Sequence, residues 1–246
     1  IAANIDVAFI LQSCDANFNI HRLERYLVMI NDGQIEPRLV LTKCDLVDAQ
    51  ELQRLVSLVR EARIDCPIIP ISNRTGAGLE ELRGMMEGGK TYCLLGSSGV
   101  GKTTTVNQLI GQTLFDTQAV RDYDGKGRHT TARRQLIVLE QGAMLIDTPG
   151  MRELGTIGMS SGIDQSFIDI AEMSTRCRFG DCTHTTEAGC VLLNAVEDGQ
   201  LSKARYDSYL KLISESNYHE MSYAEKRKKD KEFGKFIKTV SKQIRK

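Results

Sequence analysis

The sequence predicts an α/β fold, in which a mostly parallel sheet with helices on both faces is followed by a smaller helical region. Short apolar runs alternate with helical patterns up to about residue 155. These runs are apolar along their whole length, which is typical of strands buried on both faces of a parallel sheet. From Gly162 onward the patterns are helical only. We therefore expect domains at 1–158 and 159–222 and a tail at 223–246.

Each expected element follows from its local pattern. β-branched or apolar runs bounded by turn residues predict strands, and apolar residues recurring every three to four positions predict helices. The expected strands are Val7–Leu11, Leu39–Leu41, Ile68–Ile71, Tyr92–Leu95, Leu136–Leu139 and Met144–Ile146. The expected helices are Ile20–Ile30, Ala49–Ala62, Leu79–Met86, Thr103–Ile110, Phe167–Met173, Val191–Glu197 and Lys203–Ser216.

The composition is that of a globular protein. The chain has 246 residues, 41% hydrophobic and 26% charged, and this excludes collagen-like, coiled-coil and disordered chains. No apolar run approaches the ~18–20 residues that span a bilayer. Asp6 and Asp15 flank the first short apolar stretch, which argues against a signal peptide. We expect a cytoplasmic monomer with no membrane partner.

The net charge of zero is a cancellation. Residues 225–246 contain ten Lys or Arg and three Asp or Glu, net +7, whereas residues 1–224 contain 22 and 29, net −7. Apolar residues recur in the tail at helical spacing: Phe233, Phe236, Ile237, Val240 and Ile244. The tail is therefore predicted to be a basic amphipathic helix whose charged face contacts RNA phosphates. A solvated charge run is the alternative, and binding to a membrane surface is less favoured.

Residues 92–103, YCLLGSSGVGKT, match the phosphate-loop pattern G-x4-G-K-[ST], with the required strand before it and helix after it. Backbone N–H groups and the helix start favour phosphate there. Lys102 is expected to reach the β- and γ-phosphates and Thr103 to bind Mg²⁺. The expected nucleotide ligands are Gly96, Ser97, Ser98, Gly99, Val100, Gly101, Lys102, Thr103 and Thr104. An ordinary glycine-rich turn is the alternative.

A second acidic motif follows the phosphate loop. An apolar strand ends in Asp147, and Gly150 comes three residues later. We expect Asp147 to bind Mg²⁺, directly or through water, and the Gly150 N–H to meet the γ-phosphate. Alone this D-x-x-G pattern is weak, since any strand that ends in a turn produces it.

A third motif predicts the base. Thr42-Lys43-Cys44-Asp45 resembles the N-K-x-D box of GTPases, with threonine in place of asparagine. The Asp45 carboxylate can accept from both N1–H and N2–H of guanine, and adenine lacks this donor pair. The stem of Lys43 is expected to lie over the base, and Ser72 and Asn73 resemble the loop that meets the guanine oxygen. A capped strand-to-helix turn is the alternative for residues 42–45 alone.

The order of the motifs is permuted. The base box at 42–45 precedes the phosphate loop at 96–103, whereas the phosphate loop comes first in Ras-like GTPases. Chains tolerate such permutation when their ends lie near each other at the surface. The sequence therefore predicts a circularly permuted P-loop GTPase domain, followed by a small helical zinc-binding domain.

The zinc prediction rests on Cys177, Cys182, His184 and Cys190, which lie within fourteen residues. Three thiolates and one imidazole form the ligand set of one structural Zn²⁺ and leave no position for a catalytic water. A reactive or merely buried thiol cluster is the alternative. The other cysteines are isolated and are expected to be reduced core residues: Cys14, Cys44, Cys66 and Cys93.

With these motifs, the chain resembles the RsgA (YjeQ/EngC) family of circularly permuted bacterial GTPases over about residues 3–216. Lys126–Thr131 resembles the family's switch I, Ile146–Glu153 its switch II, and the cysteine and histidine spacing its zinc knuckle. The resemblance implies an oligonucleotide-binding (OB) barrel ahead of the GTPase domain. This chain begins at the first GTPase strand with Ile1 rather than methionine, so we expect a truncated or incomplete chain that lacks the barrel.

The hydrolytic residues are less conventional. Met151 follows D-x-x-G where Ras-like enzymes place the glutamine that orients water, so intrinsic hydrolysis should be slow. The resemblance implies that His129 acts catalytically, with Lys102 and Thr131. Alternatively, His129 contacts RNA or only orders its loop. Thr130 or Thr131, with Thr131 preferred, is expected to bind Mg²⁺.

The resemblance implies a GTPase that binds the small ribosomal subunit and its rRNA and assists late maturation, with GTP/GDP, Mg²⁺ and Zn²⁺ as ligands. The GTP-bound form should bind the subunit, and hydrolysis should promote release. Two alternatives stay open. One is an RNA- or ribosome-docking module with negligible turnover, and the other is a P-loop ATPase, against which Asp45 argues.

Overall fold

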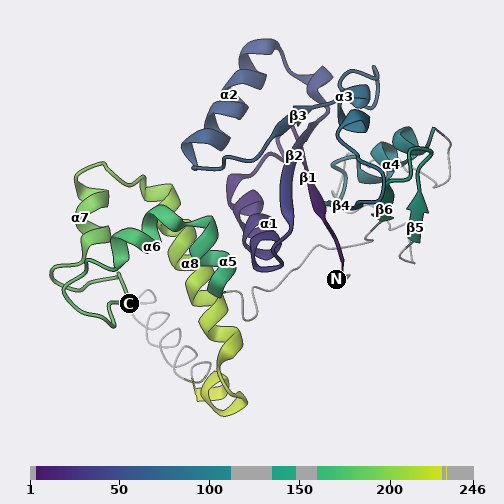
Figure 1. Cartoon of the computed structure of the whole chain (residues 1–246). Coiled ribbons are helices and arrows are strands. Elements are labelled where there is room, and N and C mark those ends of the chain that lie inside the picture. The colour runs from purple at the N-terminus through teal and green to yellow at the C-terminus, as the bar shows by residue number, and fades with distance from the viewer. Residues whose placement is uncertain (1–3, 112–134, 148–159, 229–230, 232–246) are drawn as a thin grey trace, which may run out of the picture.

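The computed structural model describes residues 4–111, 135–147, 160–228 and 231. A twisted sheet flanked by helices lies beside a second group of helices (Figure 1). The predicted switch I, Gly150, Met151 and most of the basic tail lie outside the described residues.

Six strands form one sheet in the order β3-β2-β1-β4-β6-β5. Every neighbouring pair is parallel except β5 and β6. Strand β1 is buried over its whole length, as expected for a central strand covered on both faces. The prediction of a mostly parallel sheet is confirmed. The strands are β1 Val7–Ser13, β2 Glu36–Thr42, β3 Ile68–Pro70, β4 Thr91–Leu95, β5 Gln135–Val138 and β6 Met144–Asp147.

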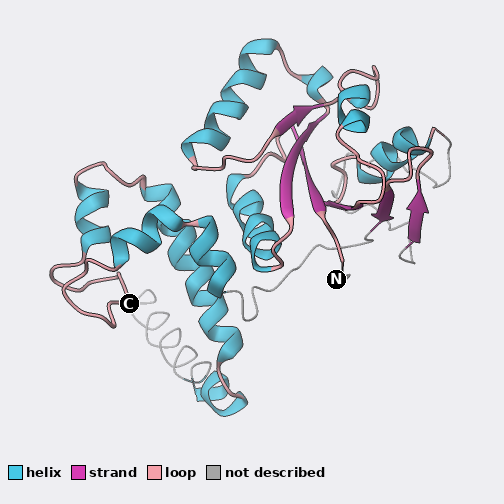
Figure 2. Ribbon diagram, in the orientation of Figure 1, coloured by secondary structure: helices cyan, strands magenta, loops and turns pink. Residues whose placement is uncertain are grey.

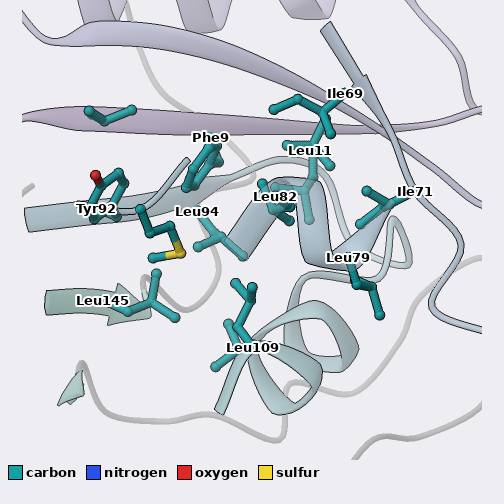
Figure 3. Close-up of a cluster of buried hydrophobic side chains, with 14 of the residues drawn as sticks. Phe9, Leu11, Ile69, Ile71, Leu79, Leu82, Tyr92, Leu94, Leu109 and Leu145 are labelled. Carbon is teal, nitrogen blue, oxygen red and sulfur yellow. The ribbon is translucent and has the colours of Figure 1, made fainter. Parts of the chain in front are cut away.

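Helices cover both faces of this sheet (Figure 2). Because successive strand residues point to opposite faces, Phe9 and Leu11 contribute to one core, while Ala8 and Ile10 contribute to the other. The first core includes residues of α3 and α4, and Phe9 stacks there on Tyr92 with ring centroids 5.5 Å apart (Figure 3). The second includes residues of α1 and α2. These helices are α1 Ile20–Asp32, α2 Ala49–Glu61, α3 Leu79–Gly84 and α4 Lys102–Ile110.

The second group consists of α5 Ser160–Ser166, α6 Ile168–Ser174, α7 Val191–Glu197 and α8 Lys203–Glu220. Its core contains Phe167, Ile170, Leu192 and Tyr209. Val28 of α1 belongs to the same core, so the helical group shares a helix with the sheet region.

Helix α5 is absent from the sequence prediction. Its sequence, SSGIDQS, is poor in strong helix formers, and its packing on α1 explains why it is helical. The two helices approach so closely that a Cβ on Gly162 would lie 2.1 Å from the Val28 carbonyl oxygen. Ser161 Oγ also donates to Asp32 Oδ1 at 2.8 Å.

A buried polar network joins the helical group to the sheet region. Arg205 of α8 donates two hydrogen bonds to Asp169, at 2.7 and 3.0 Å, and one to the carbonyl oxygen of Ala62 at 2.6 Å. Glu24 of α1 lies 3.5 Å from Arg205 and accepts from Ser208 Oγ at 2.5 Å. Glu24 and Arg205 are almost fully buried. We refer to these five residues as the interface network.

Other elements agree with the predicted ones to within a few residues. Helix α8 ends at Glu220, four residues after the expected Ser216. Residues 223–228 are helical, as predicted for the start of the tail. Within the described ranges, no helix combines the length and the apolar character that a membrane crossing requires.

Candidate functional site

The candidate nucleotide site lies at the carboxyl edge of the sheet. Strands β1 and β4 are parallel neighbours near its centre, and their following segments lead to helices on opposite faces. Such a switch point opens a crevice at the carboxyl ends of the strands, where α/β proteins bind ligands. The phosphate loop follows β4, and the predicted base box follows β2.

The phosphate loop has the backbone that its glycines permit. Gly96 has φ +150°, and a Cβ there would lie 2.5 Å from the Leu11 carbonyl oxygen. Gly101 has φ +97° and is the N-cap of α4, so Thr103 and Thr104 lie in the first turn of that helix. Lys102 Nζ donates to the carbonyl oxygens of Gly96, at 2.6 Å, and Ser97, at 2.8 Å. The Lys102 ammonium is thus held across the loop. Ser98 and Gly99 lie between Ser97 and Lys102 in the loop, and Val100 is buried.

Two residues that the sequence analysis missed contact this loop. Arg22 Nη1, from the first turn of α1, donates to Ser97 Oγ at 2.7 Å and to Asn17 Oδ1 at 3.0 Å. Asn17 Nδ2 also donates to Ser97 Oγ, at 3.2 Å. The available signal was position, because both residues follow a strand whose carboxyl end lies beside the phosphate loop.

Thr42 joins the base box to the phosphate loop. Its side chain is fully buried, and Oγ1 donates to the Val100 carbonyl oxygen at 2.7 Å. The bond fixes the end of β2 against the segment that follows β4. A hydroxyl at position 42 is therefore compatible with the site geometry, although the usual residue of the motif is asparagine.

Lys43 is held in an unusual conformation. Its φ of +58° is uncommon for a residue with a side chain, and such strain is concentrated at functional sites. Lys43 Nζ forms an ion pair with Asp15 Oδ2 at 2.9 Å. Burial tends to raise the pKa of Asp15, but hydrogen bonds from Lys43, Ser13 and the Asn17 amide outweigh it and lower that pKa. Asp15 is a further residue that the sequence analysis missed, and it positions the lysine predicted to lie over the base.

Asp45, the predicted base-reading carboxylate, already has two partners. Ser72 Oγ donates to Asp45 Oδ1 at 2.5 Å, and Arg74 Nε contacts Oδ2 at 2.9 Å. These contacts, Ser72 foremost, lower the pKa of Asp45, so it is a carboxylate at neutral pH. The structure therefore brings together the two predicted base loops, the first at residues 42–45 and the second at residues 72–76.

Asn73 binds the helix after the phosphate loop. Its Nδ2 donates to Thr105 Oγ1 at 3.0 Å, and Thr105 Oγ1 in turn donates to the Gly101 carbonyl oxygen at 2.9 Å. The Asn73 side chain thus connects the second base loop to α4.

The predicted Mg²⁺ and catalytic residues are only partly described. The backbone of Asp147 ends β6 and pairs with Leu94, two residues before Gly96, at the same edge of the sheet. The other predicted residues lie outside the described ranges: His129, Thr130, Thr131 and Gly150.

A second candidate site lies in the helical group. Cys177, Cys182, His184 and Cys190 bring their ligand atoms within 4.8 Å of one another, and the described residues contain no other such group. His184 Nδ1 lies 3.6 Å from Cys177 Sγ and 3.5 Å from Cys190 Sγ. In a tetrahedral zinc site, bonds of about 2.3 Å to sulfur and about 2.0–2.1 Å to nitrogen place these atoms about 3.6 Å apart. The cluster therefore fits zinc.

Surrounding groups orient these ligands. The Val191 amide donates to Cys177 Sγ at 3.4 Å, and Tyr206 Oη donates to the His184 carbonyl oxygen at 2.5 Å. Burial lowers the pKa of His184, which favours the neutral imidazole that binds metals. Glu187 accepts from the amides of Thr183, Thr185 and Thr186. The hydrogen bond from the Thr183 hydroxyl, followed by those from the Thr186 and Thr183 amides, lowers the pKa of Glu187 to about 2.

The other cysteines have no comparable arrangement. Cys14, Cys66 and Cys93 are buried in the sheet region, and Cys44 is half-buried. Burial raises the pKa of Cys14 and Cys93 to about 12, so both are neutral thiols.

The sequence of this chain is similar to those of known proteins. The RsgA GTPase family model matches residues 1–157. The small ribosomal subunit biogenesis GTPase RsgA 2 of Vibrio parahaemolyticus is 40% identical over 100% of this chain and 68% of its own length. The small ribosomal subunit biogenesis GTPase RsgA of Streptomyces coelicolor is 44% identical over 88% of this chain and 59% of its own length. The chain thus spans 68% and 59% of the lengths of these two relatives.

Two solved structures share the fold. The crystal structure of YjeQ from Thermotoga maritima matches 86% of this chain and 71% of its own, with a TM-score of 0.64 and 27% identity. That of YloQ, described as a circularly permuted GTPase, matches 89% of this chain and 71% of its own, with a TM-score of 0.63 and 27% identity. The permuted order of the motifs, the fold and the sequence similarity agree: this chain belongs to the RsgA GTPase family.

Proposed function

We propose that this chain binds guanine nucleotides and hydrolyses GTP to GDP and phosphate. The observation that carries the proposal is the Thr42–Val100 hydrogen bond, which joins the base box that contains Asp45 to the phosphate loop. Membership of the family supports it. The expected contacts are with Thr42, Lys43, Asp45, Ser72, Asn73, residues 96–104 and Gly150.

Mg²⁺ would be held by Thr103, Asp147 and one of Thr130 and Thr131. A divalent cation supplies charge stabilisation to the transferring phosphoryl group. Lys102 would bind the same phosphates, and His129 would position water in place of the absent glutamine. His129→Ala should lower stimulated turnover and leave nucleotide affinity nearly intact. Unchanged stimulated turnover would remove His129 from the mechanism.

Base preference is tested by titrating the chain with GDP and ADP. We expect tighter binding of GDP and loss of this preference in Asp45→Asn, because an amide cannot accept both guanine donors. A chain that binds ADP as tightly as GDP would instead support the P-loop ATPase alternative.

We propose the small ribosomal subunit as the partner, with rRNA contacts, and the cytoplasm as the place of action. Support comes from the names of the curated relatives. The net charge of +7 in residues 225–246 would favour contact with RNA phosphates. We also propose that the chain acts as a monomer, with domains at 1–158 and 159–222 and a tail at 223–246.

Turnover measured with small subunits, with large subunits and with neither separates this function from the docking-module alternative, which Met151 favours. We expect stimulation by small subunits only. Binding to small subunits without stimulation would favour the docking module.

We propose one structural Zn²⁺ bound by Cys177, Cys182, His184 and Cys190. When bound, it supplies cross-links within the helical group and no catalysis. Purified protein should contain about one equivalent of zinc, and a chelator should lower its melting temperature. Glu187→Gln should speed zinc loss, because the neutral amide binds the loop amides less strongly. Protein that contains no zinc and is insensitive to chelator would contradict the assignment.

A further inference from the structure

The contact between Arg74 and Asp45 involves a residue that the proposed nucleotide chemistry does not use. Arg74 lies in the second base loop, and its side chain is 74% exposed, whereas that of Asp45 is 11% exposed. Arg74 Nε lies 2.9 Å from Asp45 Oδ2. The exposed part of the Asp45 carboxylate is therefore in contact with the long side chain of Arg74, which follows Ser72 by two residues.

The backbone of this loop is fixed where the contact begins. Ser72 Oγ accepts hydrogen bonds from the amides of Arg74, at 3.2 Å, and Thr75, at 3.1 Å, while it donates to Asp45 Oδ1. Ser72 thus occupies one carboxylate oxygen and holds the start of the Arg74 side chain beside the other. The loop therefore places the Arg74 guanidinium beside the Asp45 carboxylate.

The chemistry of the two possible partners is the same. The N1–H and N2–H groups of guanine are part of a guanidine unit, and they present two parallel donors to a carboxylate. An arginine guanidinium presents the same planar pair of donors. Adenine has no such edge. Arg74 would therefore compete with guanine, and not with adenine, for the Asp45 carboxylate.

We propose that Arg74 is an internal competitor of the guanine base, which must leave Asp45 before guanine can bind. The inference rests on the proposed guanine-nucleotide function and adds a residue that sets its affinity. Because the ion pair is partly exposed, the competition should be modest, about two- to five-fold in dissociation constant.

The test compares GDP and ADP titrations of the unmodified chain, Arg74→Ala and a matched control, Arg54→Ala. Arg54 also has an exposed side chain paired with a carboxylate, that of Glu51 on α2, at 2.7 Å through Nε and through Nη2. We expect Arg74→Ala to bind GDP about two- to five-fold more tightly and ADP unchanged. Arg54→Ala should bind both as the unmodified chain does.

ADP also reports the general loss of a positive charge, which would weaken both nucleotides together. A preference for GDP over ADP that does not rise in Arg74→Ala, while the unmodified chain prefers GDP to ADP, would overturn the inference and leave the proposed function intact. A chain without GDP preference would refute both. In Asp45→Asn the ion pair is lost, so adding Arg74→Ala should no longer tighten GDP binding; continued tightening there would also overturn the inference.

Discussion

At the scale of single residues, the phosphate loop was predictable because its chemistry depends on residues that are adjacent in sequence. Gly96, Gly101 and Lys102 lie within seven positions, so their spacing alone indicates the ligand. Arg22 and Ser97 are separated by 75 positions, and their hydrogen bond exists only because β1 and β4 are neighbours in the sheet. A single sequence contains no spacing rule for such a pair.

Thr42 illustrates how one buried hydroxyl supports the site. In Thr42→Val the shape is nearly retained, but the Val100 carbonyl oxygen loses its donor. We expect the free energy of unfolding to fall by about 1–3 kcal/mol, the usual cost of a buried group without a partner, and GDP to bind more weakly. Denaturant unfolding and GDP titration measure the two effects.

The control is Thr42→Ser, which keeps the hydroxyl and removes only a methyl group. It should retain GDP affinity and most of the stability. A valine variant that matches the unmodified chain in stability and GDP affinity would show that this hydrogen bond does not support the site.

At the scale of elements, strong periodicity predicted the strands and the longer helices, whereas α5 required a neighbour. Ser160–Ser166 has no helical signal of its own, and the Gly162 contact with α1 supplies the stabilisation. The exact starts of the strands depended on pairing. For example, β2 begins at Glu36, three residues before the expected Leu39, because Glu36 pairs with Val7.

The α1–α5 contact predicts a strong effect of a small substitution. In Gly162→Ala the added Cβ would lie 2.1 Å from the Val28 carbonyl oxygen and 2.8 Å from Asp32 Cβ, so one helix must move. We expect a loss of about 1–3 kcal/mol in unfolding free energy, as for other overpacked sites. Denaturant unfolding followed by circular dichroism measures it.

Gly84→Ala is the matched control, since a Cβ at Gly84, the last residue of α3, meets no atom within 4 Å. It should be neutral or slightly stabilising, because alanine is the better helix former. A Gly162→Ala variant as stable as this control would show that the helices do not pack as closely as described.

At the scale of the whole molecule, the interface network joins the helical group to the sheet region through hydrogen bonds between buried polar groups. Breaking one member leaves its partners without compensation, which is costly in a buried site. The sequence could not predict this network, because Glu24, Asp169 and Arg205 come from three helices far apart in the chain. Their patterns individually indicate ordinary exposed charges.

The network also predicts a pH dependence. Burial raises the pKa of Glu24 above its ordinary value of 4.5, although Ser208 and Arg205 oppose the shift. The folded state therefore binds the proton more tightly than the unfolded chain. The stability that this group contributes is fully present below about pH 4.5 and is lost as pH rises through the raised pKa. Its slope is at most about 1.4 kcal/mol per pH unit.

Glu24→Gln removes this titration, so its stability relative to the unmodified chain should improve as pH rises from 4.5. Urea unfolding at several pH values measures the difference. The pKa of Asp169 is lowered, since its bonds to Arg205 outweigh burial, so Asp169 titrates below this range. Glu61→Gln, at an exposed position on α2, serves as the control. A constant difference between Glu24→Gln and the unmodified chain would contradict the raised pKa.

The position of α1 has a mechanical consequence. Its first turn places Arg22 on the phosphate loop, and Val28, about 9 Å further along the helix axis, lies inside the core of the helical group. A helix is stiff over this length, so α1 acts as a strut between the two. Val28 shares that core with Cys190, so one helix contacts both the phosphate loop and the core beside the cysteine–histidine cluster.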